Sequence, residues 1–300
     1  MAHTPRPLRS LASLLLLICL GAHGASVQST DIIDQFIPSL PFAKQPWGVA
    51  QCYGLFIPIG QLAESGINGT PLPLGGTLRF GKAPDPADPA RVSLRVTLMP
   101  DDPPTAGAPR CETTFSPGTT GLPMGRPFWH AFVIHIPDWR ATQDEQQLFQ
   151  WHAGDATGLQ PIYSLLVRGS TMRLLLRYDT SLTPTRTTTV VRELWSTTSW
   201  TPNTWLTFVT RAVVSPNMAA SPQVRTWING KLVVNYNGPV GYNVPPTQPY
   251  VKHGIYHWTN LNPWDTRLPQ RTVHFRRGVL VNDSRNLYTP ADLAAHVNLP

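Results

Sequence analysis

Residues Tyr250-Val251-Lys252-His253-Gly254-Ile255-Tyr256 show the alternation of a β-strand whose two faces differ in chemistry. In a strand, successive side chains point to opposite faces. One face then carries two phenols, an ammonium group and a glycine that lets another group approach closely: Tyr250, Lys252, Gly254 and Tyr256. The other face is largely apolar, as packing on a core requires: Val251, His253 and Ile255. This stretch predicts a strand with one buried face and one polar face.

Two shorter stretches have the same arrangement. Gln150-Trp151-His152 places an amide and an imidazole on one face and an indole on the other. Arg110-Cys111-Glu112 places a guanidinium and a carboxylate opposite a small thiol. Three strands that each offer polar groups on one face predict a polar groove across a sheet.

The composition favours many short strands. Only 14% of the 300 residues are charged, whereas the chain has 32 prolines, 22 glycines and 10 tryptophans. Asn229-Gly230 between two alternating runs is the strongest hairpin signal, because Asn-Gly suits the positive φ angles of a type I′ turn. We expect strands at residues 49–57, 77–80, 91–99, 128–136, 148–152, 162–167, 172–178, 205–214, 224–228, 232–236, 250–258 and 272–281, a polar connector with at most one helical turn at 140–147, and a helix at 290–297 capped by Thr289. This pattern predicts an all-β fold, an antiparallel sandwich or jelly roll.

The first 24 residues have the pattern of a signal peptide. Arg6 and Arg9 precede an apolar run at 11–20 that is too short to span a bilayer, and Ala22-His23-Gly24 offers small residues for cleavage. We therefore expect residues 25–300 to form one exported domain, secreted or periplasmic, without a membrane span.

The expected mature chain keeps two cysteines, Cys52 and Cys111. In an oxidising compartment they predict one disulfide, and the alternative is two buried thiols. The formal net charge of +7 favours a polyanionic partner, although a charge of this size also serves ordinary solubility. No basic run or nucleic-acid motif indicates DNA or RNA.

In this order, the three polar stretches resemble polysaccharide lyases of the concanavalin-like jelly-roll type, over roughly residues 76–281. Gln150-Trp151-His152 resembles the Gln-x-His motif of alginate lyases, and residues 250–256 resemble their Tyr-Phe-Lys-Ala-Gly-x-Tyr motif. Arg110-Cys111-Glu112 resembles the start of their Arg-Ser/Thr-Glu-Leu-Arg motif. The Trp-x-Asn-Gly hairpin at 227–230 is closer to the heparin lyase I and glucuronan lyase branch.

The chain departs from these motifs at two places. Thr113-Thr114 follows Glu112, so the second arginine of the alginate lyase motif is absent, and His253 replaces the usual small residue. These departures bear on the substrate more than on the reaction.

The resemblance implies β-elimination at a uronic acid, in which the proton at C5 is removed and the 4-O-linked sugar is expelled. Removing a proton beside a carboxylate builds a dianion-like enolate, which needs groups that neutralise it or hydrogen-bond to it. Arg110 and Gln150 suit this task, since one offers a charged fork and the other an amide donor.

A base and an acid are also required. Histidine is available in its neutral form near neutral pH, so we expect His152 to be the base and Tyr256 the acid. In the alternative, Tyr256 serves as both and His152 orients the carboxylate. Lys252, Tyr250 and Glu112 are expected to contact the substrate. Taken singly, each of these residues also has an ordinary structural interpretation, such as cross-strand packing or a surface ion pair.

Other kinds of site fit less well. The chain lacks the Glu-x-Asp-x-x-Glu strand of similar glucanases, a Gly-x-Ser-x-Gly elbow and a His-Glu-x-x-His motif. No cofactor is expected; a structural calcium ion at Asn262, Asp265 and Asp283 is conceivable, but no dense oxygen loop indicates one. The expected partner of the chain, a monomer, is an acidic polysaccharide. We favour an unsulfated uronan, because Arg271, Arg276 and Arg277 form only a sparse basic cluster. The rival hypothesis is a non-catalytic carbohydrate-binding protein of the same architecture.

Overall fold

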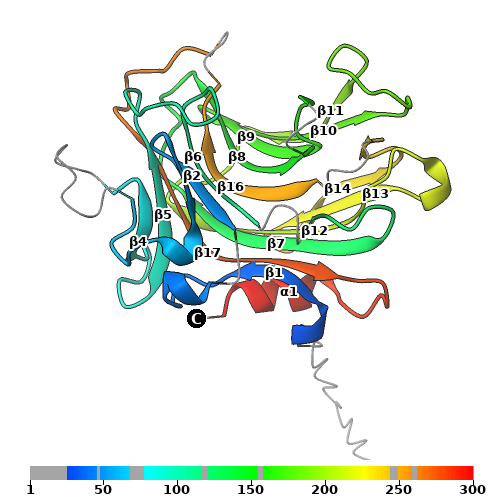
Figure 1. Ribbon diagram of the computed structural model, residues 1–300, viewed down its shortest axis with the longest axis horizontal. Coiled ribbons are helices and arrows are strands. Elements are labelled where there is room, and N and C mark those ends of the chain that lie inside the picture. The colour runs from blue at the N-terminus through cyan, green and yellow to red at the C-terminus, as the bar shows by residue number, and fades with distance from the viewer. Residues whose placement is uncertain are drawn as a thin grey trace, which may run out of the picture.

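The computed structural model describes residues 26–45, 48–67, 78–115, 121–154, 158–243, 249–258 and 262–299, so the signal peptide prediction lies outside the described residues. Within them, the chain folds into two curved sheets that lie one over the other (Figure 1). Strand pairs are antiparallel except for one short parallel pair, and the all-β jelly-roll prediction is confirmed.

The back sheet contains eight strands in the described part of the chain. Seven lie in the order β14 (Lys231–Asn237), β13 (Gln223–Ile228), β12 (Thr204–Val213), β7 (Pro127–Ile136), β17 (Arg271–Asn282), β5 (Val92–Leu98) and β4 (Phe80–Pro84), and β1 (Ile32–Phe36) also pairs with β17.

The front sheet contains nine strands over the same described ranges. Its order is β11 (Val190–Thr197), β10 (Thr171–Asp179), β9 (Tyr163–Arg168), β8 (Glu145–His152), β16 (Tyr250–Tyr256), β6 (Arg110–Thr114), β2 (Val49–Cys52) and β3 (Leu55–Pro58), with β15 (Gly241–Tyr242) parallel to β10.

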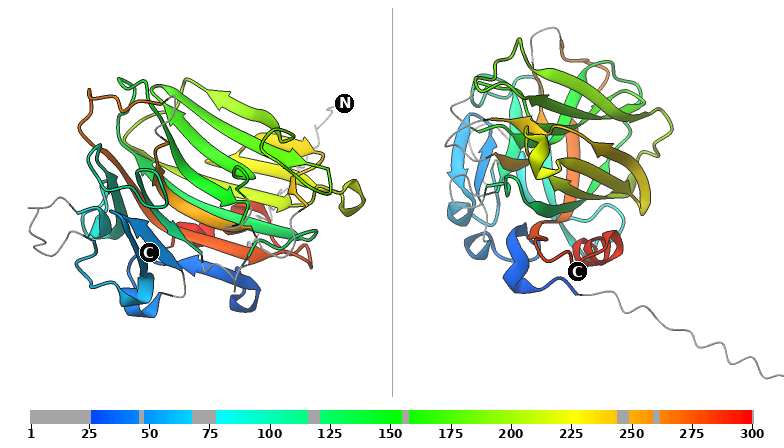
Figure 2. Two further views of the ribbon diagram at one scale, coloured as in Figure 1. Left: turned by 45° about the horizontal axis from the view of Figure 1, so that its top comes forward. Right: turned by 90° about the vertical axis from the view of Figure 1, so that its right-hand side faces the viewer.

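The core lies between the sheets and follows the alternation of the strands. On β7, Phe128, Phe132 and Ile134 point into this core, whereas Trp129 and Val133 point outward. The outward side of the back sheet is covered by α1 (Pro290–Val297), which lies beside β1 (Figures 1 and 2). The back sheet is thus covered on both faces.

The C-terminal helix α1 has the predicted cap. The Thr289 side chain accepts a hydrogen bond from the Asp292 amide, the Asp292 carboxylate accepts one from the Thr289 amide, and Pro290 occupies the first turn. In the described part of the chain, no helix is long and apolar enough to cross a membrane.

The structure corrects several predicted elements. The single strand expected at 49–57 is two, β2 and β3, because Tyr53 and Gly54 take positive φ angles (55° and 73°) and turn the chain. The polar connector ends early, since β8 already begins at Glu145 without a helical turn. Sequence reasoning missed β11 because this edge strand is largely exposed and lacks a clear apolar face. It also missed β1, in a segment expected to be irregular.

Two histidines form a polar pair inside the apolar core. His130 Nε2 on β7 lies 3.0 Å from His253 Nε2 on β16, and both side chains are fully buried. Trp151 Nε1 on β8 donates to His130 Nδ1 over 3.2 Å. The pair therefore links the back sheet to two neighbouring strands of the front sheet.

Candidate active site

The front sheet brings the three polar stretches together, because β8, β16 and β6 are consecutive neighbours. Their register sets Tyr256 opposite Arg110, Lys252 opposite Gln150, and Tyr250 opposite His152. Residues far apart in the sequence thus meet on one face of the sheet, as the alternation predicted.

Gly254 allows the close approach of β6 to β16. Its φ is +143°, and a Cβ at this position would lie 2.2 Å from the carbonyl oxygen of Cys111. A side chain would therefore push β6 away and separate Arg110 from Tyr256. The glycine predicted to let another group approach makes room for the neighbouring backbone.

A groove of about 650 Å³ crosses the outer face of the front sheet. Its walls include all four residues predicted to be catalytic: Arg110, Gln150, His152 and Tyr256. They come from β6, β8 and β16, and the remaining lining includes Leu166 on β9, Leu175 on β10 and Trp258 beyond β16.

Arg110 and Tyr256 are held against each other. The guanidinium carbon of Arg110 lies 4.3 Å from the centroid of the Tyr256 ring, the geometry of a cation–π contact. Arg110 is only 8% exposed, and its Nη1 lies 3.5 Å from Glu112 Oε2. Arg110 and Glu112 therefore form a buried ion pair in the groove wall, unlike an exposed surface ion pair.

Glu112 lies beneath the groove, where it connects several of these groups. It is 1% exposed and accepts a hydrogen bond of 2.6 Å from Gln150 Nε2. Lys252 Nζ lies 4.0 Å from Glu112 and donates to Gln51 over 2.9 Å. Because the carboxylate faces these partners, its position suits orienting Gln150 and Arg110.

The three residues expected to contact substrate, Glu112, Lys252 and Tyr250, are thus all buried and do not line the groove. Tyr250 packs its ring 4.9 Å from the His152 ring, and Lys252 lies 5.6 Å from the Tyr250 ring. These three residues therefore pack beneath the groove, where Glu112 contacts Gln150 and Tyr250 contacts His152.

His152 has one ring nitrogen already engaged. The Gly154 amide donates to His152 Nδ1 over 3.2 Å. An imidazole nitrogen that accepts a hydrogen bond carries no proton, so in the neutral ring the proton sits on Nε2. His152 consequently presents a donor at Nε2.

Comparison with known families gives a direct match. The family model described as "Polysaccharide lyase" matches residues 83–276, more than half of the chain. The chain belongs to the polysaccharide lyase family. A comparison with curated protein sequences found no match.

Two solved structures share the fold of this lyase at low sequence identity. The endo-beta-1,4-glucuronan lyase from the fungus Trichoderma reesei is 13% identical with a TM-score of 0.56, over 71% of this chain and 88% of the other. The alginate lyase AlgAT5 from Polysaccharide Lyase family 7 is also 13% identical, with a TM-score of 0.53, over 82% of this chain and 98% of the other.

Gln147 and Arg177 are among the groove residues of the lyase that sequence reasoning missed. Gln147 lines the groove because β8 has a bulge between Gln147 and Phe149, so that Gln147 and Gln150 share a face although they are three residues apart. Arg177 on β10 also lines it. The sequence feature that could have revealed Arg177 is a charged residue directly after the apolar run Leu174-Leu175-Leu176.

Arg177 is a buried cation in the groove wall of the lyase. It is 8% exposed, and its Nη1 donates to the Pro161 carbonyl (3.1 Å) and to Ser164 Oγ (3.2 Å). Burial lowers the pKa of Arg177, but a guanidinium remains protonated in proteins. Among the described residues, the charged side chains that line the groove are those of Arg110, Arg177, Arg186 and Glu145. Since Glu145 pairs with Arg173, the groove favours an anionic ligand.

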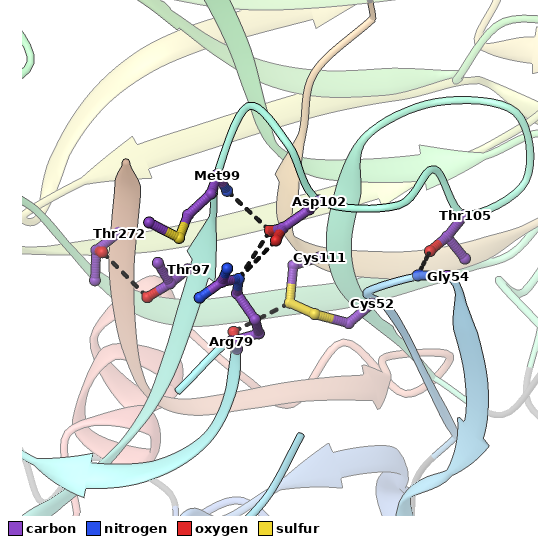
Figure 3. The surroundings of a disulfide bond; sticks show 9 residues. All are labelled: Cys52, Gly54, Arg79, Thr97, Met99, Asp102, Thr105, Cys111 and Thr272. Carbon is purple, nitrogen blue, oxygen red and sulfur yellow. Dashed lines mark hydrogen bonds and ion pairs between the residues drawn. A yellow bond between two sulfur atoms is a disulfide. The ribbon is translucent and has the colours of Figure 1, made fainter. Parts of the chain in front are cut away.

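A disulfide fastens the strand that carries Arg110 and Glu112 (Figure 3). Cys52 on β2 and Cys111 on β6 are directly opposite in the sheet and bonded to each other. The loop that precedes Arg110 is held as well, since Asp102 accepts from Arg79 Nε over 2.7 Å and Thr105 Oγ1 accepts from the Gly54 amide over 2.8 Å. Arg110 is thus held on both sides along the chain, by the anchored loop before it and by the disulfide at Cys111 after it.

The candidate calcium ligands are dispersed. Asn262 bonds the backbone of Glu145, Asp265 pairs with Arg267, and Asp283 pairs with Arg211. Among the residues that the structure describes, no three His, Cys, Asp or Glu side chains gather as a metal site. The sparse basic cluster is also outside the groove lining, with Arg271 buried against Asp144.

Proposed function

We propose that this lyase cleaves a uronate-containing acidic polysaccharide by β-elimination and leaves 4,5-unsaturated ends. The observation that supports this proposal is the convergence of Arg110, Gln150, His152 and Tyr256 in one cation-lined groove. An unsulfated uronan is favoured, because the described arginines of the groove are few and lie on separate segments: β6, β10 and the loop between β10 and β11. The family membership and the two lyase neighbours agree with this chemistry.

The first demand of the reaction is stabilisation of the enolate. Arg110 would neutralise the substrate carboxylate as charge builds on it, and Gln150 would donate its second amide hydrogen. Glu112 holds Gln150 at 2.6 Å and Arg110 at 3.5 Å, so neither group has to be reoriented when the charge develops. Preorganised donors of this kind supply much of the rate enhancement of enzymes.

The second demand is proton transfer. We propose that Tyr256 reacts as the phenolate: its oxygen takes the C5 proton, and the phenol so formed gives this proton to the 4-oxygen as the C4–O bond breaks and the C4–C5 double bond forms, which regenerates the phenolate. The hydrogen bond that His152 Nδ1 accepts supports this assignment, because it places the ring proton on Nε2, where the imidazole is a donor and not a base. The alternative, His152 as base and Tyr256 as acid alone, requires His152 to adopt the other tautomer.

Replacing His152 with glutamine separates these two assignments. Glutamine keeps an N–H donor but cannot act as a base. If His152 donates to the carboxylate, kcat of His152→Gln should stay within about tenfold of the parent, whereas His152→Ala should lose about 100-fold. Steady-state kinetics on one uronan measures both. Equal losses in the two variants would identify His152 as the base.

We also propose that the mature protein is exported. The Cys52–Cys111 disulfide fits an oxidising compartment, where such bonds persist. The leader-like pattern of residues 1–24 supports the same conclusion.

The function is tested by following far-ultraviolet absorbance, which reports the new double bond. The purified protein is incubated with glucuronan, both alginate block types, pectate, hyaluronan and heparin. We expect absorbance to rise with an unsulfated uronan and to remain flat with heparin. No rise on any polymer, from a folded protein that is retained on a polyanion column, would instead favour the non-catalytic carbohydrate-binding protein.

A further inference from the structure

A second hollow of about 460 Å³ adjoins the groove at the end of β8 and β9. It shares the lining residues Glu145 and Trp258 with the groove, so the two spaces lie side by side. Trp258 stands at the junction, with its ring centroid 6.2 Å from that of Tyr256. A ligand that leaves the groove past Tyr256 and Trp258 therefore enters this second hollow.

The line continues into a third hollow of about 390 Å³ at the β9–β10 turn. It shares Gln143 and Arg168 with the second hollow, and Arg140 and Arg173 also line it. Three neighbouring hollows thus extend from Tyr256 to the β9–β10 turn, each sharing lining residues with the next. A polymer several sugars long suits such a line better than a small molecule does.

The charges along this line are arranged for an anion. The acidic side chains in the wall of the second hollow already have arginine partners: Asp144 with Arg271 at 2.6 Å, Glu145 with Arg173, and Asp265 with Arg267. Arg168 is exposed at the end of β9, and the described residues provide it with no acidic partner. It is the cation of this wall that remains available to a ligand.

We infer that the second hollow binds further uronate residues of the polysaccharide that is cleaved beside Tyr256, with Arg168 contacting a carboxylate and Trp258 packing against a sugar. This inference rests on the proposed function and specifies its substrate, which is a polymer bound well beyond the scissile bond. The lyase then acts within chains and favours long substrates over short ones.

The test is the dependence of KM on substrate length for Arg168→Ala. With a long uronan, we expect KM to rise about fivefold and kcat to change little, because an exposed charge-assisted contact far from the reacting atoms contributes to binding alone. The ratio of variant KM to parent KM should approach 1 as the oligosaccharides become too short to leave the groove. Arg168→Lys, which keeps the charge, should recover part of the loss.

The matched control is Arg225→Ala, which removes the same charge from β13 of the back sheet. It should leave KM unchanged at every substrate length. If the ratio of Arg168→Ala KM to parent KM is the same for short and long substrates, or equals the ratio of the control, the inference is wrong. The proposed lyase activity would not be affected by that result.

A binding measurement tests the hollow without turnover. Calorimetric titration of Tyr256→Phe with long polyglucuronate and polymannuronate should give a dissociation constant about fivefold lower than that of Tyr256→Phe/Arg168→Ala. Equal constants, or no binding to either polymer, would reject the inference. Absence of product from the parent protein would reject the proposed function separately.

Discussion

Tyr256→Phe is expected to lower kcat on the preferred uronan by about 10³-fold, while the protein stays folded and KM changes by less than about threefold. Removing the phenol oxygen takes away the group that moves the proton, and general acid–base catalysis contributes about 10²- to 10⁴-fold. The ring remains, so its packing against Arg110, 4.3 Å away, is retained. Initial rates of absorbance increase give kcat and KM, and thermal unfolding verifies the fold.

Tyr178→Phe provides the control for this substitution. Tyr178 lies on β10 of the same sheet, but its side chain is not among those lining the groove. Its loss of a phenol oxygen should leave kcat near the parent value. Parental turnover by Tyr256→Phe would show that another group transfers the proton.

The fold should lose stability steeply in acid because of the buried histidine pair. Burial lowers the pKa of His130 to about 3, and burial together with the neighbouring His130 lowers that of His253 well below its ordinary value. The rings around the pair are aromatic: Phe36, Phe115, Phe132, Phe149, Phe275 and Trp151. These contacts include no carboxylate that could neutralise the positive charge of a protonated histidine.

The sign follows from which state binds protons. Below about pH 6.5 the unfolded chain protonates these histidines and the folded chain does not, so the free energy of unfolding falls as pH decreases. The decrease approaches about 1.4 kcal/mol per pH unit for each histidine, and for His130 it continues to about pH 3. For His130 alone this amounts to about 5 kcal/mol. Urea denaturation between pH 8 and pH 3.5 measures the slope.

The variant His130→Leu/His253→Ala isolates this contribution. At pH 8, where both histidines are neutral in both states, the difference from the parent reports the changed packing and the lost hydrogen bonds of the pair, without a contribution from protonation. Below pH 6.5 the variant should lose stability less steeply with falling pH than the parent does. Parallel curves would show that the acid sensitivity comes from other groups, such as His274, whose pKa burial also lowers to about 4.

Alternation along the strands was enough to predict the fold class and the two faces of residues 250–256. The faces of residues 250–256 were predicted correctly, because in any strand the side chains two residues apart lie on the same face, whichever strands are its neighbours. The C-terminal helix was equally readable, since the Thr289 cap and Pro290 act through local backbone geometry.

Only the tertiary structure decided which strands are neighbours and which polar residues face the groove. Strand order depends on contacts between segments far apart in the chain, so the meeting of Arg110 with Tyr256 is not encoded in either stretch alone. The β8 bulge breaks the period of two and brings Gln147 to the groove. Depth is also a tertiary property. Glu112, Lys252 and Tyr250 share the polar face with the groove residues, but neighbouring side chains cover them, and the groove is lined by Arg110, Gln150, His152 and Tyr256 instead.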